Sequence, residues 1–575
     1  MGLARVLPLF QHLAAPDRGS RTDDLIAGAI TAILLVPQGM AYALLAGLPP
    51  EMGLYASIVP PFVYAFFGTS RALAVGPVAV AALMVASALG HYAGGNQALW
   101  LTGAMILAAE TGLILLVLGL FRLGALVSFI SHPVLSGFTS GAAVLIMASQ
   151  IKHLTGIDLE RGHALETLHA FVQQLDQLHA VTLAFGAVAI VALLLGRQPL
   201  VRLLQRLGLS ARAATLASRT APLAVVIGST VVAALLSADR AHDLAVVGAI
   251  PAGLPWPSLS FFAAEGWLEL FPSAVLIALV GYVESVSVAK VLAARRRQKI
   301  DANKELTALG ITNMAAAVAG TMPVAGGFSR SVVNFDAGAQ TQLAAIITAV
   351  LVALVALFFT AWFHYLPNAV LAAIIVVAVA QLIDLDTARR TWAYDRADGC
   401  ALAATFVAVF VLGIELGLLM GIGVSLALYL WRTSRPHMAV MGRVSGTEHF
   451  RNVNRHVVET DPCLVVIRID ENIYFANAAQ VEEYVAQHLT AMPEARHVLL
   501  VMTAVSYIDA SGLEMLEHLE EDLSHADVTL HLAEVKGPVA DRLAVSRLGE
   551  RVADRTYLTT DLAFCAITGR EQAHD

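Results

Sequence analysis

Long stretches without a charged residue alternate with short polar loops over the first three quarters of the chain. Asp, Glu, Lys and Arg are absent from six windows, which cover residues 25–50, 72–109, 123–151, 177–196, 220–238 and 337–383. A membrane-spanning helix needs about 20 predominantly apolar residues. The two longest windows each predict two spans, because loop residues at 91–96 and 363–368 interrupt them. With the apolar runs near Tyr55, Val280, Ala315, Phe406 and Leu426, the pattern predicts about 14 membrane segments.

The pattern changes after Arg435 to that of a soluble α/β domain. Buried strands are predicted at 463–469 and 497–502, and a capped loop that runs into an amphipathic helix at 509–516. Another strand is predicted at 525–535 and another helix at 538–548. The sequence therefore predicts a cytoplasmic N-terminal segment at 1–22, a transmembrane domain at 23–435 and a small soluble domain at 436–575. We expect the transmembrane domain to consist of two repeats, at about 23–238 and about 266–435.

Composition supports this division. The 575 residues are 57% hydrophobic and 14% charged, whereas a soluble domain carries roughly a quarter charged residues. Of the 36 Lys and Arg and the 44 Asp and Glu, 11 and 22 lie after Val440. An acidic tail without a basic cluster argues against nucleic acid as a partner. Three well-separated cysteines provide neither a disulfide framework nor a metal motif, and the first apolar run begins too late and is too long for a cleavable signal peptide.

Arginine positions predict the orientation in the membrane. Basic residues end every second segment, while acidic residues such as Asp158, Glu160, Asp239 and Glu265 lie in the other loops. The basic ends are at Arg71, at Arg122, at 197–219, at 295–299, at Arg389 and Arg390, and at Arg432 and Arg435. The positive-inside rule then places both termini in the cytoplasm. We expect a multi-pass protein of the inner membrane.

Two segments in corresponding positions of the two halves are interrupted. Residues 74–82 and 323–331 each contain Gly and Pro just before a helical run, and each is the third segment of its half. Such a pair is typical of inverted-repeat transporters, whose half-helix N-termini bind an anion at the repeat interface. The alternative is that Gly and Pro only allow close packing of helices.

Three ionisable residues fall inside predicted segments, where charge is costly and usually functional. They are Glu110, Glu284 and Arg330. We expect Glu284 and Arg330 to pair, because each lowers the desolvation cost of the other; the pair would be either functional or a static structural salt bridge. For Glu110 we expect a position near the membrane interface or at a helix contact.

Several blocks resemble the SulP sulfate permease family in order along nearly the whole chain. They lie at 49–57, 76–80, 283–290, 327–331 and 413–418. The resemblance implies fourteen segments in a seven-plus-seven inverted repeat, divided into core and gate domains, and a homodimer. It also implies an anion held between the third and tenth segments, in contact with side chains or backbone N–H groups of Gln38, Tyr42, Val78, Ala79, Phe328, Ser329, Arg330 and Ser331.

The eighth segment, with its glutamate at Glu284, resembles the eighth segment of the proton-coupled sulfate transporters of this family. We therefore expect proton-coupled sulfate symport with Glu284 and Arg330 as the coupling groups, and no cofactor or metal. A sodium- or proton-coupled bicarbonate or dicarboxylate carrier is the alternative within transport. A membrane-anchored anion sensor or regulatory scaffold acting through its tail is the alternative of another class. No nucleophile and base stand at useful spacing for an enzyme.

The tail resembles the STAS domain, on the block at 469–478. The resemblance implies that this domain can bind a cytoplasmic protein. Ser511 matches the position that is phosphorylated in related bacterial regulators. The alternative role for its hydroxyl is the N-cap of the following helix.

Overall fold

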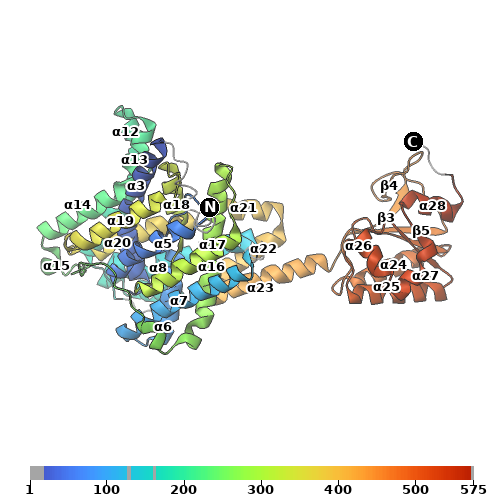
Figure 1. Ribbon diagram of the computed structural model, residues 1–575, viewed down its shortest axis with the longest axis horizontal. Helices are drawn as coiled ribbons and strands as arrows, with labels where there is room; N and C mark the ends of the chain where they lie inside the picture. The colour runs from blue at the N-terminus through green and yellow to red at the C-terminus, as the bar shows by residue number, and fades with distance from the viewer. Residues whose placement is uncertain (1–17, 126–130, 159–163, 572–575) are drawn as a thin grey trace, which may run out of the picture. The chain divides into compact units, whose positions relative to one another are not determined.

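The computed structural model describes residues 18–125, 131–158 and 164–571 (Figure 1), so most of the predicted segment 1–22 lies outside the described residues. The chain divides into two compact units between Ser425 and Leu426. This division falls within helix α23 (Ile414–Thr433), ten residues before the end of the predicted transmembrane domain at 435.

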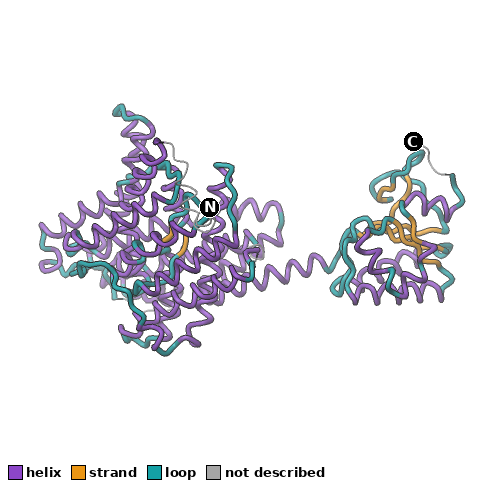
Figure 2. Tube along the Cα trace, viewed as in Figure 1, coloured by secondary structure: helices purple, strands orange, loops and turns teal. Residues whose placement is uncertain are grey.

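The first unit is helical, apart from one short ribbon of two strands (Figure 2). Its first half contains α3 (Arg18–Leu45), α4 (Pro50–Tyr55), α5 (Val59–Phe67), α6 (Ala79–Tyr92), α7 (Gln97–Leu120), α8 (His132–Ser149), α9 (Ile151–Thr155), α10 (Ala164–Gln173), α11 (Ala180–Leu195), α12 (Gln198–Arg206), α13 (Ala211–Arg219), α14 (Ala221–Leu235) and α15 (Ala238–Ala241). Its second half contains α16 (Trp267–Arg295), α17 (Ala302–Val318), α18 (Phe328–Asp336), α19 (Leu343–Phe358), α20 (Asn368–Val379), α21 (Leu385–Tyr394), α22 (Arg396–Leu412) and α23.

Fewer of these helices are full spans than the fourteen predicted segments. Within the described residues, 6 helices are long and apolar enough to cross a membrane, or up to 8 if each of two bent pairs is one span. The difference arises because Gly and Pro break several segments into shorter pieces, such as α4 with α5, α6 and α18. Each predicted apolar run nevertheless contains a helix.

The two interrupted segments meet in space. Strand β1 (Val75–Gly76) precedes α6, strand β2 (Ala325–Gly326) precedes α18, and the two strands pair antiparallel, with Val75 opposite Gly326. Antiparallel pairing of corresponding segments is what a two-fold axis between inverted repeats produces.

The second unit is a mixed sheet with helices on both faces. Its elements are β3 (Met438–Arg443), β4 (Phe450–Asn452), β5 (Leu464–Ile469), α24 (Ala478–Ala491), β6 (His497–Val501), α25 (Ala510–His525), β7 (Thr529–Ala533), α26 (Gly537–Leu543), α27 (Arg547–Arg551), β8 (Thr556–Tyr557) and α28 (Thr560–Thr568). The strand order is β4-β3-β5-β6-β7-β8. Strands β5 to β8 are parallel and β3 pairs antiparallel with both neighbours.

Alternate residues of the central strands fill two separate cores. Val465 and Ile467 pack with α24, α25, α26 and α27, whereas Leu464 and Val466 pack with α28. This explains the continuous apolar runs of these strands, since both faces of the sheet are covered. The predicted strand at 525–535 was wrong at its start, because α25 continues to His525 and a turn with positive φ at Asp527 precedes β7.

Candidate functional site

Two half-helix N-termini converge in the first unit. Helix α6 begins after Val78 and α18 after Gly327, and neither start has a side-chain cap. Their first turns close with Ala82 N–H donating to the carbonyl of Val78, and Ser331 N–H donating to that of Gly327. The N–H groups of residues 79–81 and 328–330 therefore have no partner within their helices. Each helix end also carries about half a positive charge.

A small cavity of about 40 Å³ lies at these two helix ends. Its volume suffices for a few water molecules or one small ion. The lining residues come from α3, from both interrupted segments, from α16 and from the end of α20: Gln38, Tyr42, Val78, Ala79, Val80, Glu284, Gly327, Phe328, Ser329, Arg330, Ala378, Val379 and Leu382.

Most of the residues singled out from the sequence face this one cavity. Ser331 does not. Its buried hydroxyl accepts a hydrogen bond from Ala74 N–H at 2.9 Å and so fixes the strand before α6. The sequence pattern placed it in the first turn of a half-helix, but its side chain points toward the other repeat.

Arg330 is the cationic group of the cavity. It is 3% exposed, and its Nη1 donates to the carbonyl of Pro77 at 2.7 Å. Its Nε and Nη2 are buried without a hydrogen-bond partner. The guanidinium lies against glycine backbone: a Cβ on Gly327 would come within 3.0 Å of Nη2. Buried N–H donors normally have a hydrogen-bond acceptor, and a planar guanidinium forms its strongest hydrogen bonds with oxyanions.

The expected ion pair between Glu284 and Arg330 is absent from the described residues. Both side chains line the cavity, but none of the salt bridges within 4.0 Å in the described chain joins them. Arg330 instead uses Nη1 on the Pro77 carbonyl. The carbonyl of Pro77 thus takes the place that was expected for the carboxylate of Glu284.

Side chains from several helices hold the extended segments in place. Ser285 Oγ accepts from Gly326 N–H at 2.7 Å. The amide of Asn313 donates to and accepts from the backbone of Val324, at 3.1 and 2.9 Å. Gln342 Nε2 donates to the carbonyl of Ser70 at 2.6 Å. These bonds satisfy backbone groups that neither a helix nor a full sheet satisfies, and they position the two helix starts.

Two buried carboxylates outside the cavity were missed by the sequence analysis. Glu305, which is 0% exposed, accepts hydrogen bonds from Tyr64 Oη at 2.7 Å and from Thr69 N–H at 2.7 Å. Asp24 accepts from Gln340 N–H at 2.6 Å and from Thr341 Oγ1 at 2.6 Å. Both residues lie near helix starts and close to other charged residues in the sequence. The sequence alone therefore does not distinguish them from exposed charged residues.

Three apolar cavity residues were also missed: Ala378, Val379 and Leu382. They come from the end of α20 and the short turn after it. Nothing in an apolar run distinguishes these residues from others in the same helix.

Glu110 lies in the middle of α7 and is 4% exposed, and its Oε2 has no hydrogen-bond partner. It is not among the cavity residues. The side chain is thus inside the helical unit and not at its surface.

In the second unit, Ser511 is exposed in the first turn of α25. Its alternative role as N-cap was wrong, because Asp509 is the N-cap residue and accepts from Gly512 N–H at 2.7 Å. The hydroxyl of Ser511 is therefore not needed to begin the helix.

The second unit also contains a histidine pair that the sequence did not indicate. His497 Nδ1 and His531 Nε2 are 3.0 Å apart across neighbouring strands. Burial lowers the pKa of His531 to about 4, and the nearby positive groups of His497 and Arg555 act in the same direction, whereas Asp554 opposes them. His531 is therefore neutral at physiological pH. No cluster of three His, Cys, Asp or Glu in the described residues could hold a metal ion.

Comparison with known proteins matches the two units separately. Residues 22–405 match the sulfate permease family, and residues 454–563 match the STAS domain. The chain is 36% identical over 548 residues to sulfate transporter 4.1, chloroplastic, of Arabidopsis thaliana, covering 93% of this chain and 78% of that protein. It is 32% identical to high affinity sulfate transporter 2 of Stylosanthes hamata, covering 97% and 86%.

Among solved structures, the murine Solute Carrier 26 family member A9 anion transporter matches with a TM-score of 0.89. The sequence identity is 22%, and the alignment covers 98% of this chain and 94% of that one. At this identity the likeness shows the fold.

Proposed function

The chain belongs to the sulfate permease family of membrane anion transporters, which are not enzymes, and on that premise we propose that it carries sulfate by proton-coupled symport. The bound anion would lie between the starts of α6 and α18. Transport would proceed by alternating access, with this cavity opening in turn to each side of the membrane.

The observation that carries the proposal is that Arg330 is buried with two of its nitrogens lacking a hydrogen-bond partner. A guanidinium with two buried, unpartnered nitrogens beside two uncapped helix starts offers charge and N–H donors to one small oxyanion. Ser329 and Tyr42 line the same cavity and add hydroxyl groups. Sulfate has four acceptor oxygens and suits donors that converge from opposite sides.

Proton coupling follows from the charge that sulfate carries. Bringing a divalent anion into a cell at about −100 mV costs roughly 4.6 kcal/mol, and each co-transported proton returns about 2.3 kcal/mol. At least two protons are therefore needed to offset the electrical cost. Glu284 is the carboxylate that lines the cavity, and its protonation removes a negative charge that repels sulfate. We propose that Glu284 takes up one of these protons.

The test is uptake of radiolabelled sulfate by proteoliposomes that contain the full chain. An inward proton gradient should accelerate uptake, and replacing sodium with choline should not. Unlabelled bicarbonate, fumarate and chloride serve as competitors. Uptake driven by a sodium gradient would instead assign the chain to the sodium-coupled carriers. Stronger inhibition by unlabelled bicarbonate or fumarate than by unlabelled sulfate would assign it to the bicarbonate or dicarboxylate carriers.

We further propose that the protein is a homodimer in the cell inner membrane with both termini in the cytoplasm, and that its STAS domain can bind a cytoplasmic protein. The alternation of arginine-rich and acidic loops supports this orientation. Saturable anion binding without flux would favour the alternative of an anion sensor.

A further inference from the structure

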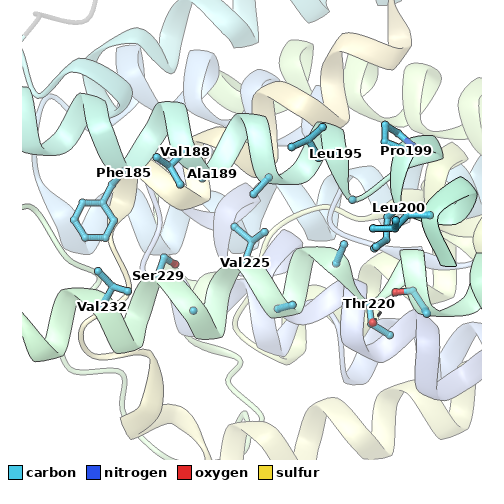
Figure 3. A pocket seen from close by; sticks show the side chains of 17 residues that line it. Phe185, Val188, Ala189, Leu195, Pro199, Leu200, Thr220, Val225, Ser229 and Val232 are labelled. Carbon is cyan, nitrogen blue, oxygen red and sulfur yellow. Dashed lines mark hydrogen bonds between the residues drawn. The ribbon is translucent and has the colours of Figure 1, made fainter. Parts of the chain in front are cut away.

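A long apolar groove of about 750 Å³ runs between α11 and α14, with α12 and α13 at one end. It shares no lining residue with the cavity beside Arg330. Figure 3 shows the groove from Phe185 and Val232 at one end to Leu195 and Thr220 at the other. Among the described lining residues only Thr220 and Ser229 are polar, so the groove suits a hydrocarbon chain.

The groove is open because several of its lining residues are small. Ala189, Ala192, Ala224 and Gly228 line the groove, where larger side chains would fill it. The backbone comes close at the C-cap of α11, since a Cβ on Gly196 would lie 2.6 Å from the Cβ of Ala221 at the start of α14. Near this point the chain bends by 55° between α11 and α12 and by 44° between α13 and α14.

The length of the groove matches one leaflet of a bilayer. From Phe185 to Leu195 the chain advances ten residues along α11, which is about 15 Å at the rise of an α-helix. The hydrocarbon core of a bilayer is about 30 Å thick, so one leaflet is about half of that. An acyl chain that enters from the end near α12 would therefore reach the other end of the groove at the midplane.

Positive charge gathers at the end near α12. Residues 197–219 contain five arginines and no Asp or Glu. Arg197 and Arg219 are committed to other groups: Arg197 donates to the carbonyl of Val377 at 2.8 Å, and Arg219 binds Asp336 at 3.0 Å. Arg202 and Arg206 are exposed, one turn apart on α12, and form no ion pair within the described chain.

We propose that the groove binds one acyl chain of an anionic phospholipid, with Arg202 and Arg206 in contact with its head group. A neutral lipid, a partner helix or a second copy of the chain could also cover apolar residues. None of these gives a reason for two exposed arginines at the end of the groove, in a stretch of chain (197–219) that contains no Asp or Glu. The bend between α11 and α12 also contacts the helix that ends at the cavity beside Arg330. Arg197, at this bend, donates to the carbonyl of Val377, which directly precedes the cavity residues Ala378 and Val379.

Native mass spectrometry of the detergent-purified full chain tests the proposal, with phosphatidylglycerol and phosphatidylcholine of identical acyl chains as probes. We expect phosphatidylglycerol to bind at least tenfold more tightly. Arg202→Gln with Arg206→Gln should remove most of this preference, because one arginine beside an anionic head group contributes roughly fivefold. The matched control is Arg389→Gln with Arg390→Gln, another exposed arginine pair that lies on α21, away from the groove; it should retain the preference.

A second variant tests the groove itself. Ala192→Leu with Ala224→Leu fills it and should weaken binding of both lipids. If the filled variant does not fold, the arginine variant still decides the outcome, because its changes are on the surface. Equal affinity for the two lipids, or an unchanged preference in the arginine variant, would overturn the proposal. So would a filled variant that loses its dimer while binding phosphatidylglycerol as before, since that assigns the groove to a second copy.

Discussion

Arg219 and Asp336 form an ion pair at 3.0 Å that joins α13 to the C-terminal end of the half-helix α18. Arg219 also donates to the carbonyl of Val333, in the last turns of the same half-helix, at 2.9 Å. The helix whose first turn faces the cavity beside Arg330 is thus tied at its other end to a helix that flanks the apolar groove.

Breaking this pair should shift the conformational equilibrium of the transporter. If alternating access moves α18 against α13, the pair must open in each cycle. Because both side chains are partly exposed, we expect at most about 1 kcal/mol, or about a fivefold change in the maximal rate of uptake, in Arg219→Gln. The swap of Arg219→Asp with Asp336→Arg should restore the rate. Rates that are identical in all three proteins would show that α13 and α18 do not separate during transport.

Arg330→Ala should weaken sulfate binding by at least tenfold. The change removes the cation of the cavity and its donors, while the helix starts remain. Equilibrium binding of radiolabelled sulfate to the purified protein measures it, with Arg389→Ala as a control for loss of one arginine elsewhere. Wild-type affinity in Arg330→Ala would remove this residue from the binding site.

Glu284→Gln should separate exchange from coupling. The amide imitates a permanently protonated carboxyl group, so sulfate–sulfate counterflow should continue. Acceleration of net uptake by an inward proton gradient should be lost or reduced several-fold. Both assays use the same proteoliposomes, which makes counterflow the control for protein folding. A proton gradient that drives the variant as it drives the wild type would assign coupling to another group.

Two neighbouring serines should respond differently to the same substitution. Ser331→Ala leaves the buried N–H of Ala74 without its acceptor, which should cost about 1–3 kcal/mol of stability and lower the melting temperature. Ser329→Ala removes a hydroxyl at the cavity, and we expect a raised KM for sulfate with nearly unchanged melting. Thermal unfolding and uptake kinetics on both variants distinguish these roles. A reversed result would place Ser331 in the site.

The STAS domain should lose stability in mild acid through His531. Its pKa of about 4 in the folded chain lies below the usual 6.5, so the unfolded chain binds the proton more readily. This residue costs no stability above about pH 6.5. As the pH falls from there toward about 4, stability should decline by up to roughly 1 kcal/mol per unit. Thermal scans that follow unfolding of the tail should show a smaller decline in His531→Leu than in the wild type.

Periodicity and turn residues were sufficient to predict the order of helices and the change to an α/β tail, because membrane burial and sheet burial leave long apolar runs. The interrupted segments at 74–82 and 323–331 were also recognisable, since only Gly and Pro break such runs. Glu284 and Arg330 were recognisable as charged residues inside apolar segments, whereas Gln38 and Tyr42, which line the same cavity, were accessible only through the resemblance to the SulP family.

What the sequence could not provide is the direction of side chains on irregular backbone. Ser329 and Ser331 are two residues apart in one motif, yet one faces the cavity and the other fixes the opposite repeat. Likewise, Glu305 resembles an ordinary charged residue at a helix start, and only the packing of α5 against α17 places the hydroxyl of Tyr64 on its carboxylate. Such contacts join residues more than 200 positions apart and have no local signal.

The ribbon of β1 and β2 also sets an order of events during synthesis. Val75 and its partner Gly326 are about 250 residues apart, so at about 5–20 residues per second the first strand waits roughly 12–50 s for its partner to leave the ribosome. During that interval the strand before α6 lacks its pairing partner, and a nascent chain that ends before residue 325 lacks half of the proposed site. The proposed anion site would thus be a late product of biogenesis, and a chain released early from the ribosome would enter the membrane with only the first of its two half-helices.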